Sequence, residues 1–129
     1  MKRLRGKGLP QEELDAIYAY VKTMRPVPAA DEPHAPEARR GAQLFASERA
    51  ACATCHDPTN GYTDHEKHEI GFDVVVTPSL LGVGARGTLF HDGKYGSLEH
   101  LLDGPDEMGG LARLDAAEKK DLAAFLRTL

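Results

Sequence analysis

Large aromatic side chains are scarce in this sequence, and tryptophan is absent. Only 6% of the 129 residues are aromatic, although 41% are apolar. This apolar content suffices for the core of one small domain, which is also what the chain length indicates. Such a core nevertheless has few bulky side chains to fill it. A large bound apolar group would supply the missing bulk.

Charge and hydropathy exclude two classes of partner. The net charge of −4 and the pI near 5.8 leave no basic stripe to neutralise phosphates, so we expect no nucleic-acid partner. No stretch approaches the roughly 20 apolar residues of a membrane span. The opening also lacks the pattern of a signal peptide, because Leu9-Pro-Gln-Glu-Glu13 follows the basic residues where an apolar segment should stand.

Two segments of the chain resemble each other at a constant offset of 105 residues, namely residues 9–24 and 114–129. Both have the apolar spacing of amphipathic helices: Leu14, Ile17, Val21 and Met24 in the first, Leu122, Phe125, Leu126 and Leu129 in the second. Any two amphipathic helices share some similarity. We favour a repeat, and interpret residues 1–25 as the closing helix of a preceding, related domain.

The remaining chain divides into a linker and one domain. Residues 26–36 contain four prolines, which predicts an extended, semi-rigid linker. Residues 37–129 then form the domain, with a helix expected over residues 37–47. Ser97 is positioned to cap a short helix, and Asp115 with Glu118 has the pattern of a capping box that opens the last helix.

Between His56 and Gly96 the helical pattern is lost for about forty residues, and glycine and proline interrupt the chain. A loop of this length inside a small domain usually has a function, and wrapping a cofactor is one. Only Val74–Val76 has the composition of a strand. We therefore expect an all-α domain with long loops.

The chemistry is concentrated at Cys52-Ala-Thr-Cys55-His56, a C-x-x-C-H motif. This motif is the attachment site of c-type haem. Two thiols three residues apart reach both vinyl groups on one porphyrin edge, and the adjacent imidazole reaches the iron. The motif predicts one covalent haem c on Cys52 and Cys55, with His56 as an iron ligand.

Other interpretations of the cysteine pair have less support in the sequence. A redox-active disulfide motif would need a βαβ context, and strand patterning is nearly absent. A structural disulfide between residues three apart is rarer still. A zinc site could use Cys52, Cys55, His65 and His68, but the spacings are shorter than those of zinc fingers.

The sixth iron position has two candidates. Met108 lies in a Gly-rich polar loop, a poor setting for a core methionine, and His/Met ligation suits electron transfer. His91 is the next candidate, either as a ligand or as a hydrogen-bond partner near a propionate. His65, His68 and His100 are flanked by charged residues, which predicts solvated side chains.

The domain resembles the C-terminal haem domain of the bacterial di-haem cytochrome c peroxidase and MauG-like family. Besides the C-x-x-C-H motif, the resemblance rests on short matching segments: Arg40–Phe45, Tyr62–Asp64, His68–Gly71, Thr77–Leu80 with Gly82-Val83, Phe90–Gly93, Ser97–Glu99, Met108-Gly109 and the closing helix. The resemblance implies a class I cytochrome c-like fold and an electron-transferring haem ligated by His56 and Met108. A second C-x-x-C-H motif, which the family carries, is not present in this sequence.

Two functions remain open. In the first, this domain transfers electrons to a redox partner protein or to an adjacent haem domain of the parent chain. In the second, the haem face is open, and the domain is a peroxidase that uses His91 as an acid/base group. A structural zinc module is a distant third. Because haem c is attached outside the cytoplasm, we expect a periplasmic or otherwise exported protein whose signal lies upstream of Met1.

Overall fold

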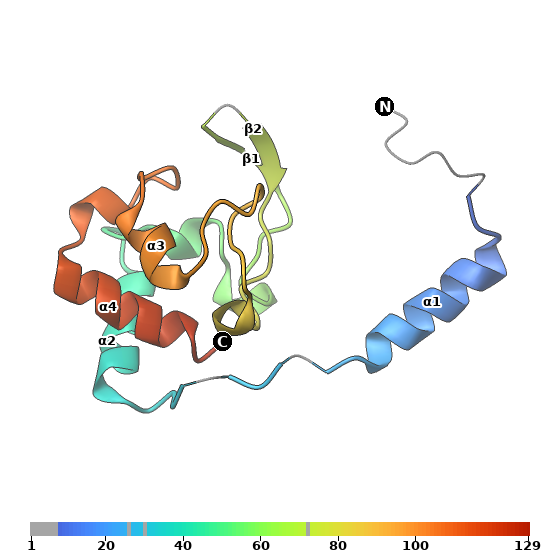
Figure 1. The fold of residues 1–129 in the computed structure, drawn as a ribbon, viewed down its shortest axis with the longest axis horizontal. Helices are drawn as coiled ribbons and strands as arrows, with labels where there is room; N and C mark the ends of the chain where they lie inside the picture. The colour runs from blue at the N-terminus through green and yellow to red at the C-terminus, as the bar shows by residue number, and fades with distance from the viewer. Residues whose placement is uncertain (1–7, 26, 30, 72) are drawn as a thin grey trace.

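The computed structural model describes residues 8–25, 27–29, 31–71 and 73–129. These residues are mostly helical, with one small two-stranded sheet (Figure 1). The α-helices are α1 (Gln11–Thr23), α2 (Pro36–Ala46), α3 (Leu98–Asp103) and α4 (Ala116–Leu126). Short 3₁₀ turns lie between them: η1 (Cys52–Thr54), η2 (Pro58–Asn60), η3 (Val83–Ala85) and η4 (Leu111–Arg113).

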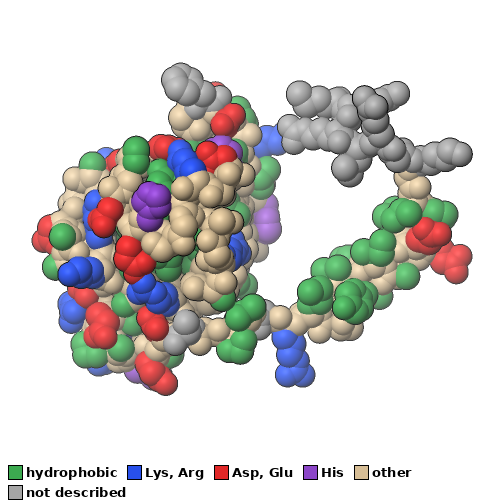
Figure 2. Space-filling view, viewed as in Figure 1, with side chains coloured by type: hydrophobic (Ala, Val, Ile, Leu, Met, Phe, Trp, Pro, Cys, Tyr) green, Lys and Arg blue, Asp and Glu red, His purple; other side chains and the backbone are tan. Residues whose placement is uncertain are grey.

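Helix α1 forms where the apolar spacing predicts it, but none of its residues is buried. Ile17, in the middle of its apolar face, is 50% exposed. Figure 2 shows apolar side chains along this helix, which stands apart from the other elements. Its origin as the end of a preceding domain stays a prediction. Among the described residues, no helix combines the length and apolar character that crossing a membrane requires.

The core is organised where α2 and α4 cross. Gly41 of α2 faces the backbone of α4, so that a Cβ at this position would lie 2.7 Å from the Cβ of Phe125 and would overlap the carbonyl of Asp121. The packing of α2 against α4 buries Phe45 and Leu122, and Leu122 is only 1% exposed. A bidentate pair between Arg40 and Asp121, with N–O distances of 2.6 and 2.7 Å, closes its outer edge.

The helix caps read from the sequence are confirmed. The Ser97 hydroxyl accepts a hydrogen bond from the His100 N–H at 3.1 Å and starts α3. The Asp115 carboxylate accepts from the N–H groups of Ala117 and Glu118, and the Glu118 carboxylate accepts from the N–H of Asp115 at 2.9 Å. This reciprocal pair is the predicted capping box of α4.

The sheet is a hairpin that the all-α expectation missed. Strand β1 (Lys67–Ile70) pairs antiparallel with β2 (Asp73–Val76), with Lys67 opposite Val76 and Ile70 opposite Asp73. The turn contains Gly71 in the left-handed region, with φ of +61°. The strand composition of Val74–Val76 is confirmed. Its partner was missed because β1 is largely polar and is recruited by pairing rather than by its own apolar pattern.

Side-chain hydroxyls hold the irregular chain beside this hairpin. Buried Thr63 donates to the carbonyl of Thr77 at 2.6 Å, and Ser79 donates to the carbonyl of Gly61 at 2.6 Å. These bonds tie the segment after the C-x-x-C-H motif to the segment after β2. The long loops are thus fixed around a common space.

The close approach at Gly41 gives a test of the core. We expect Gly41→Ala to lower the free energy of unfolding by about 2 kcal/mol or more, because its Cβ has no room beside α4. Gly87→Ala is the control, since a Cβ there meets nothing within 4 Å. Denaturant unfolding followed by circular dichroism measures both, and an unchanged midpoint for Gly41→Ala would contradict the packing described.

Candidate functional site

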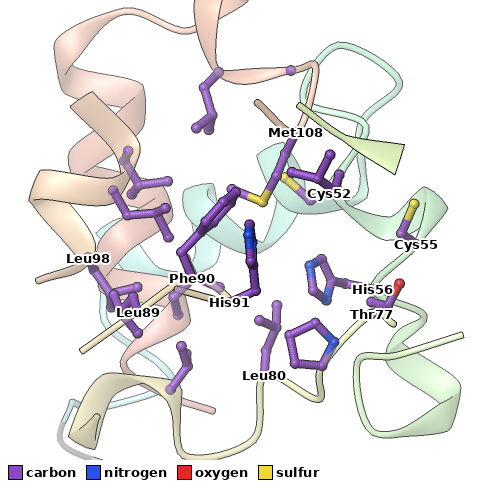
Figure 3. A pocket seen from close by; sticks show the side chains of 18 of the residues that line it. Cys52, Cys55, His56, Thr77, Leu80, Leu89, Phe90, His91, Leu98 and Met108 are labelled. Atoms are coloured by element: carbon purple, nitrogen blue, oxygen red, sulfur yellow. The ribbon is translucent and has the colours of Figure 1, made fainter. Parts of the chain in front are cut away.

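A cavity of about 320 Å³ lies inside the domain (Figure 3). Its walls come from α2, the motif segment, the hairpin, the loop before α3, α3 itself, the loop before η4, and α4. Most of the lining is apolar, and much of it also forms the core: Phe45, Val83, Leu89, Leu98, Leu102, Leu111, Leu122 and Leu126. The aromatic-poor core expected from the composition therefore encloses a large apolar space.

The C-x-x-C-H segment forms one wall of the cavity. Ala51 adopts a left-handed conformation, with φ of +56°, and turn η1 follows directly. The N–H of His56 donates to the carbonyl of Cys52 at 3.0 Å, which closes the turn. As a result Cys52, Cys55 and His56 all border the cavity.

His56 is held in one tautomer by a backbone partner. Its Nδ1 lies 3.0 Å from the carbonyl oxygen of Tyr62, which can only accept a hydrogen bond, so Nδ1 carries the proton. Burial lowers the pKa of His56, although the bond to Tyr62 opposes this shift. A neutral imidazole with a free Nε2 is the form that binds a metal ion.

Both cysteines are free thiols in the structure. Burial raises the pKa of Cys52 to about 11 and also raises the pKa of Cys55. Reactive cysteines of thiol–disulfide enzymes instead have lowered pKa values that favour the thiolate. The electrostatics of the pair therefore argue against the redox-disulfide alternative.

The four-residue zinc set considered from the sequence is not brought together in the described part of the chain. Ligand atoms of Cys55 and His68 lie within 4.8 Å of each other and of Asp64, while Cys52 and His65 are not in this group. His68 is also less solvated than predicted, because it lines the cavity and its Nε2 lies 2.7 Å from Asp64.

Met108 reaches the cavity from the loop between α3 and η4. Figure 3 shows its side chain in the pocket that His56 also lines. The side chain is 42% exposed, so it is not the gap-filling core methionine that would explain it otherwise. Buried Gly110 seats the loop against the motif segment, because a Cβ there would lie 2.7 Å from the carbonyl carbon of Ala50.

His91 also borders the cavity, and its Nε2 lies 2.9 Å from the carboxylate of Asp73. This contact links the loop before α3 to strand β2. The preceding residue, Phe90, has a φ of +76°, which is rare for an aromatic residue and fixes the direction of this loop. His91 is therefore placed where it could act on a bound group as well as hold the loop.

The residues present fit a c-type haem. Two thiols and a neutral imidazole lie on one wall of an apolar cavity, and a thioether borders the same space. Cysteine sulfurs for attachment with histidine and methionine as iron ligands are the donor set of cytochromes c. The apolar lining suits a macrocycle better than a hydrated metal ion.

The contacts of four residues near the site were missed from the sequence, namely those of Tyr62, Asp64, His68 and Arg86. The carbonyl of Tyr62 contacts His56, and Asp64 contacts His68. No local sequence pattern reveals either contact, even though Asp64 and His68 are only four residues apart. Arg86 lines the cavity too, and its guanidinium donates to the carbonyls of Ser79 and Leu81 at 2.9 and 3.1 Å.

Comparison with known proteins agrees with this chemistry. Residues 41–127 match the family described as di-haem cytochrome c peroxidase. The chain is 32% identical over 123 residues to the methylamine utilization protein MauG of Methylorubrum extorquens, and the match covers 72% of this chain and 34% of that protein. The chain thus spans about a third of the length of this curated relative. No solved structure matches. These findings confirm the family resemblance seen in the motifs.

The Asp64 contacts predict a pH dependence of stability. The N–H of Glu66, together with Thr77 and His68, lowers the pKa of Asp64 to about 2 against the effect of burial. Since the folded pKa lies below the unfolded value of about 3.9, the carboxylate stabilises the fold above that pH, and the contribution disappears as pH falls toward 2.

We therefore expect Asp64→Asn to be less stable than the unchanged protein at pH 6, with the difference narrowing by pH 2.5. Urea unfolding at the two pH values measures it. The exposed Glu48 provides the control, as Glu48→Gln. If the stability difference between Asp64→Asn and the unchanged protein were the same at both pH values, the lowered pKa of Asp64 would be refuted.

Proposed function

Because the chain belongs to the di-haem cytochrome c peroxidase and MauG family, whose members bind haem, we propose that residues 37–129 are a cytochrome c-like electron-transfer domain. One haem c would be bound covalently in the cavity. The observation that carries this proposal is the position of His56 and Met108 on the lining of one apolar cavity, beside both cysteines.

Each residue has a distinct role in this proposal. Cys52 and Cys55 would form the two thioether bonds, and His56 would ligate the iron through Nε2 while Tyr62 fixes its orientation. Met108 would be the second axial ligand. When bound, the haem supplies one-electron redox chemistry, and a methionine ligand raises its potential.

Electron transfer is favoured over catalysis because the iron would be closed on both faces. Peroxide chemistry needs a vacant iron position, and Met108 is available to fill it.

One observation favours a second candidate. The pairing of His91 with Asp73 orients an imidazole at the cavity, and the exposed Met108 side chain is held only through its loop. Were Met108 displaced, the domain would have an open haem face and His91 as an acid/base group, as a peroxidase requires.

The proposal extends to the parent protein. We propose that this domain is the C-terminal module of a longer di-haem chain, and that its electrons pass to an adjacent haem domain or to a redox partner protein. Covalent haem attachment also implies an exported, periplasmic protein.

Haem attachment gives the first test. We expect the denatured, matured protein to retain one covalently bound haem in a mass spectrum, because thioether bonds survive unfolding. The double variant Cys52→Ser/Cys55→Ser should retain none. Colourless matured protein with two free thiols would contradict the whole proposal.

The second axial ligand gives a separate test. Met108→Ala should abolish the methionine-to-iron charge-transfer band of the ferric protein and lower its potential by on the order of 0.1 V, within the roughly 0.8 V that axial ligands span. Met24→Ala is the matched control, since Met24 is exposed at the end of α1. A high-spin unchanged protein with rapid peroxide turnover would favour the peroxidase instead.

A further inference from the structure

A single carboxylate holds the loop that carries Met108. Oδ1 of Asp106 accepts hydrogen bonds from the N–H groups of Gly109, Gly110 and Leu111, at 2.9, 3.0 and 3.0 Å. Its Oδ2 accepts from the N–H of Ala112 at 3.0 Å. Four consecutive backbone donors directly after Met108 therefore converge on one side chain two residues before it.

The same loop has two further attachments. Buried Gly110 lies against the backbone of Ala50, just before the C-x-x-C-H motif. Glu107 forms an ion pair with Lys94 at 2.5 Å, and the Lys94 ammonium lies 4.4 Å from the centre of the Phe90 ring. These contacts fix the residues on either side of Met108, and Glu107 is linked to the loop that carries Phe90 and His91.

Burial does little to fix the side chain of Met108 itself. Its side chain is 42% exposed, and Gly109 beside it adopts a φ of +85°. A loop with two adjacent glycines has many conformations open to it when unrestrained, so ordering it costs conformational entropy. The direction of the thioether must therefore come from the backbone, and Asp106 supplies most of the bonds that order this backbone.

We propose that Asp106 is a positioning residue that holds the Met108 thioether at the haem iron. The inference rests on the proposed function, because it takes Met108 as an axial ligand. It goes beyond that role, because the strength of methionine ligation is set by a carboxylate that touches neither the sulfur nor the haem. Without Asp106 the loop would sample conformations in which the sulfur leaves the iron.

The test compares two variants of the full, haem-loaded chain. Asp106→Ala removes all four acceptor bonds, while Asp106→Asn keeps an oxygen that can accept the bonds from Gly109, Gly110 and Leu111. We expect Asp106→Ala to lose most of the charge-transfer band, to show a lower potential, and to bind added imidazole about tenfold more tightly or better, since hydrogen bonds to charged groups are among the stronger ones. Asp106→Asn should lie between it and the unchanged protein.

Asp115→Ala is the matched control. Asp115 also caps backbone N–H groups with its carboxylate, but at the start of α4, and neither it nor its partners Ala117 and Glu118 line the cavity. This variant should lower the melting temperature and leave the band, the potential and the imidazole affinity unchanged. A purely structural role of Asp106 would give the same result as the control.

The outcomes separate the two proposals. If the unchanged protein has the methionine band and Asp106→Asn and Asp106→Ala both keep it, with unchanged potential and imidazole affinity, the role of Asp106 is refuted and the axial role of Met108 stands. If the unchanged protein lacks the band and Met108→Ala changes nothing, both fail. Should Asp106→Ala not fold, a weakened band and tighter imidazole binding in Asp106→Asn support the role, and unchanged values refute it.

Discussion

The core of this domain and the walls of its cavity are largely the same residues, and this constraint governs the rest of the structure. Phe45, Leu98 and Leu122 are buried, yet each also borders a space of about 320 Å³. Because so few of the core side chains are aromatic, they do not fill the space between them. A ligand that fills the cavity would complete the core. Its binding free energy would then add to the free energy of unfolding. At the α2–α4 crossing, Gly41 lies directly against the backbone of Asp121, and neither of these two residues borders the cavity.

Features with a local cause could be predicted from the sequence. The helices and the caps at Ser97 and Asp115 follow from residue spacing and from side chains that bond within three residues, and the structure has them. The C-x-x-C-H motif is likewise local. Strand β1 was missed because its polar residues are ordered by pairing with β2, and the partner of His56 was missed because it is a backbone carbonyl. The domain boundaries and the roles of the site residues stay predictions.

The family match covers residues 41–127, and every residue of the cavity lies within it. Helix α1 and the linker lie outside the match, and none of their described residues lines the cavity. The segment shared with the family is therefore the segment that builds the cavity. The apolar face of α1 is exposed, and none of its residues is buried.

The two sides of the cavity are held by different means. On the His56 side, a backbone carbonyl and hydroxyl bonds from Thr63 and Ser79 fix the imidazole and the chain around it. On the Met108 side, a Gly-rich loop depends on ion-pair and carboxylate contacts at partly buried residues. Backbone bonds in a packed segment persist, whereas a loop held by side chains opens at lower cost. In the proposed function, the same scaffold would keep His56 fixed while the strength of Met108 ligation is adjusted, and that adjustment would separate an electron-transfer haem from one that is open to peroxide.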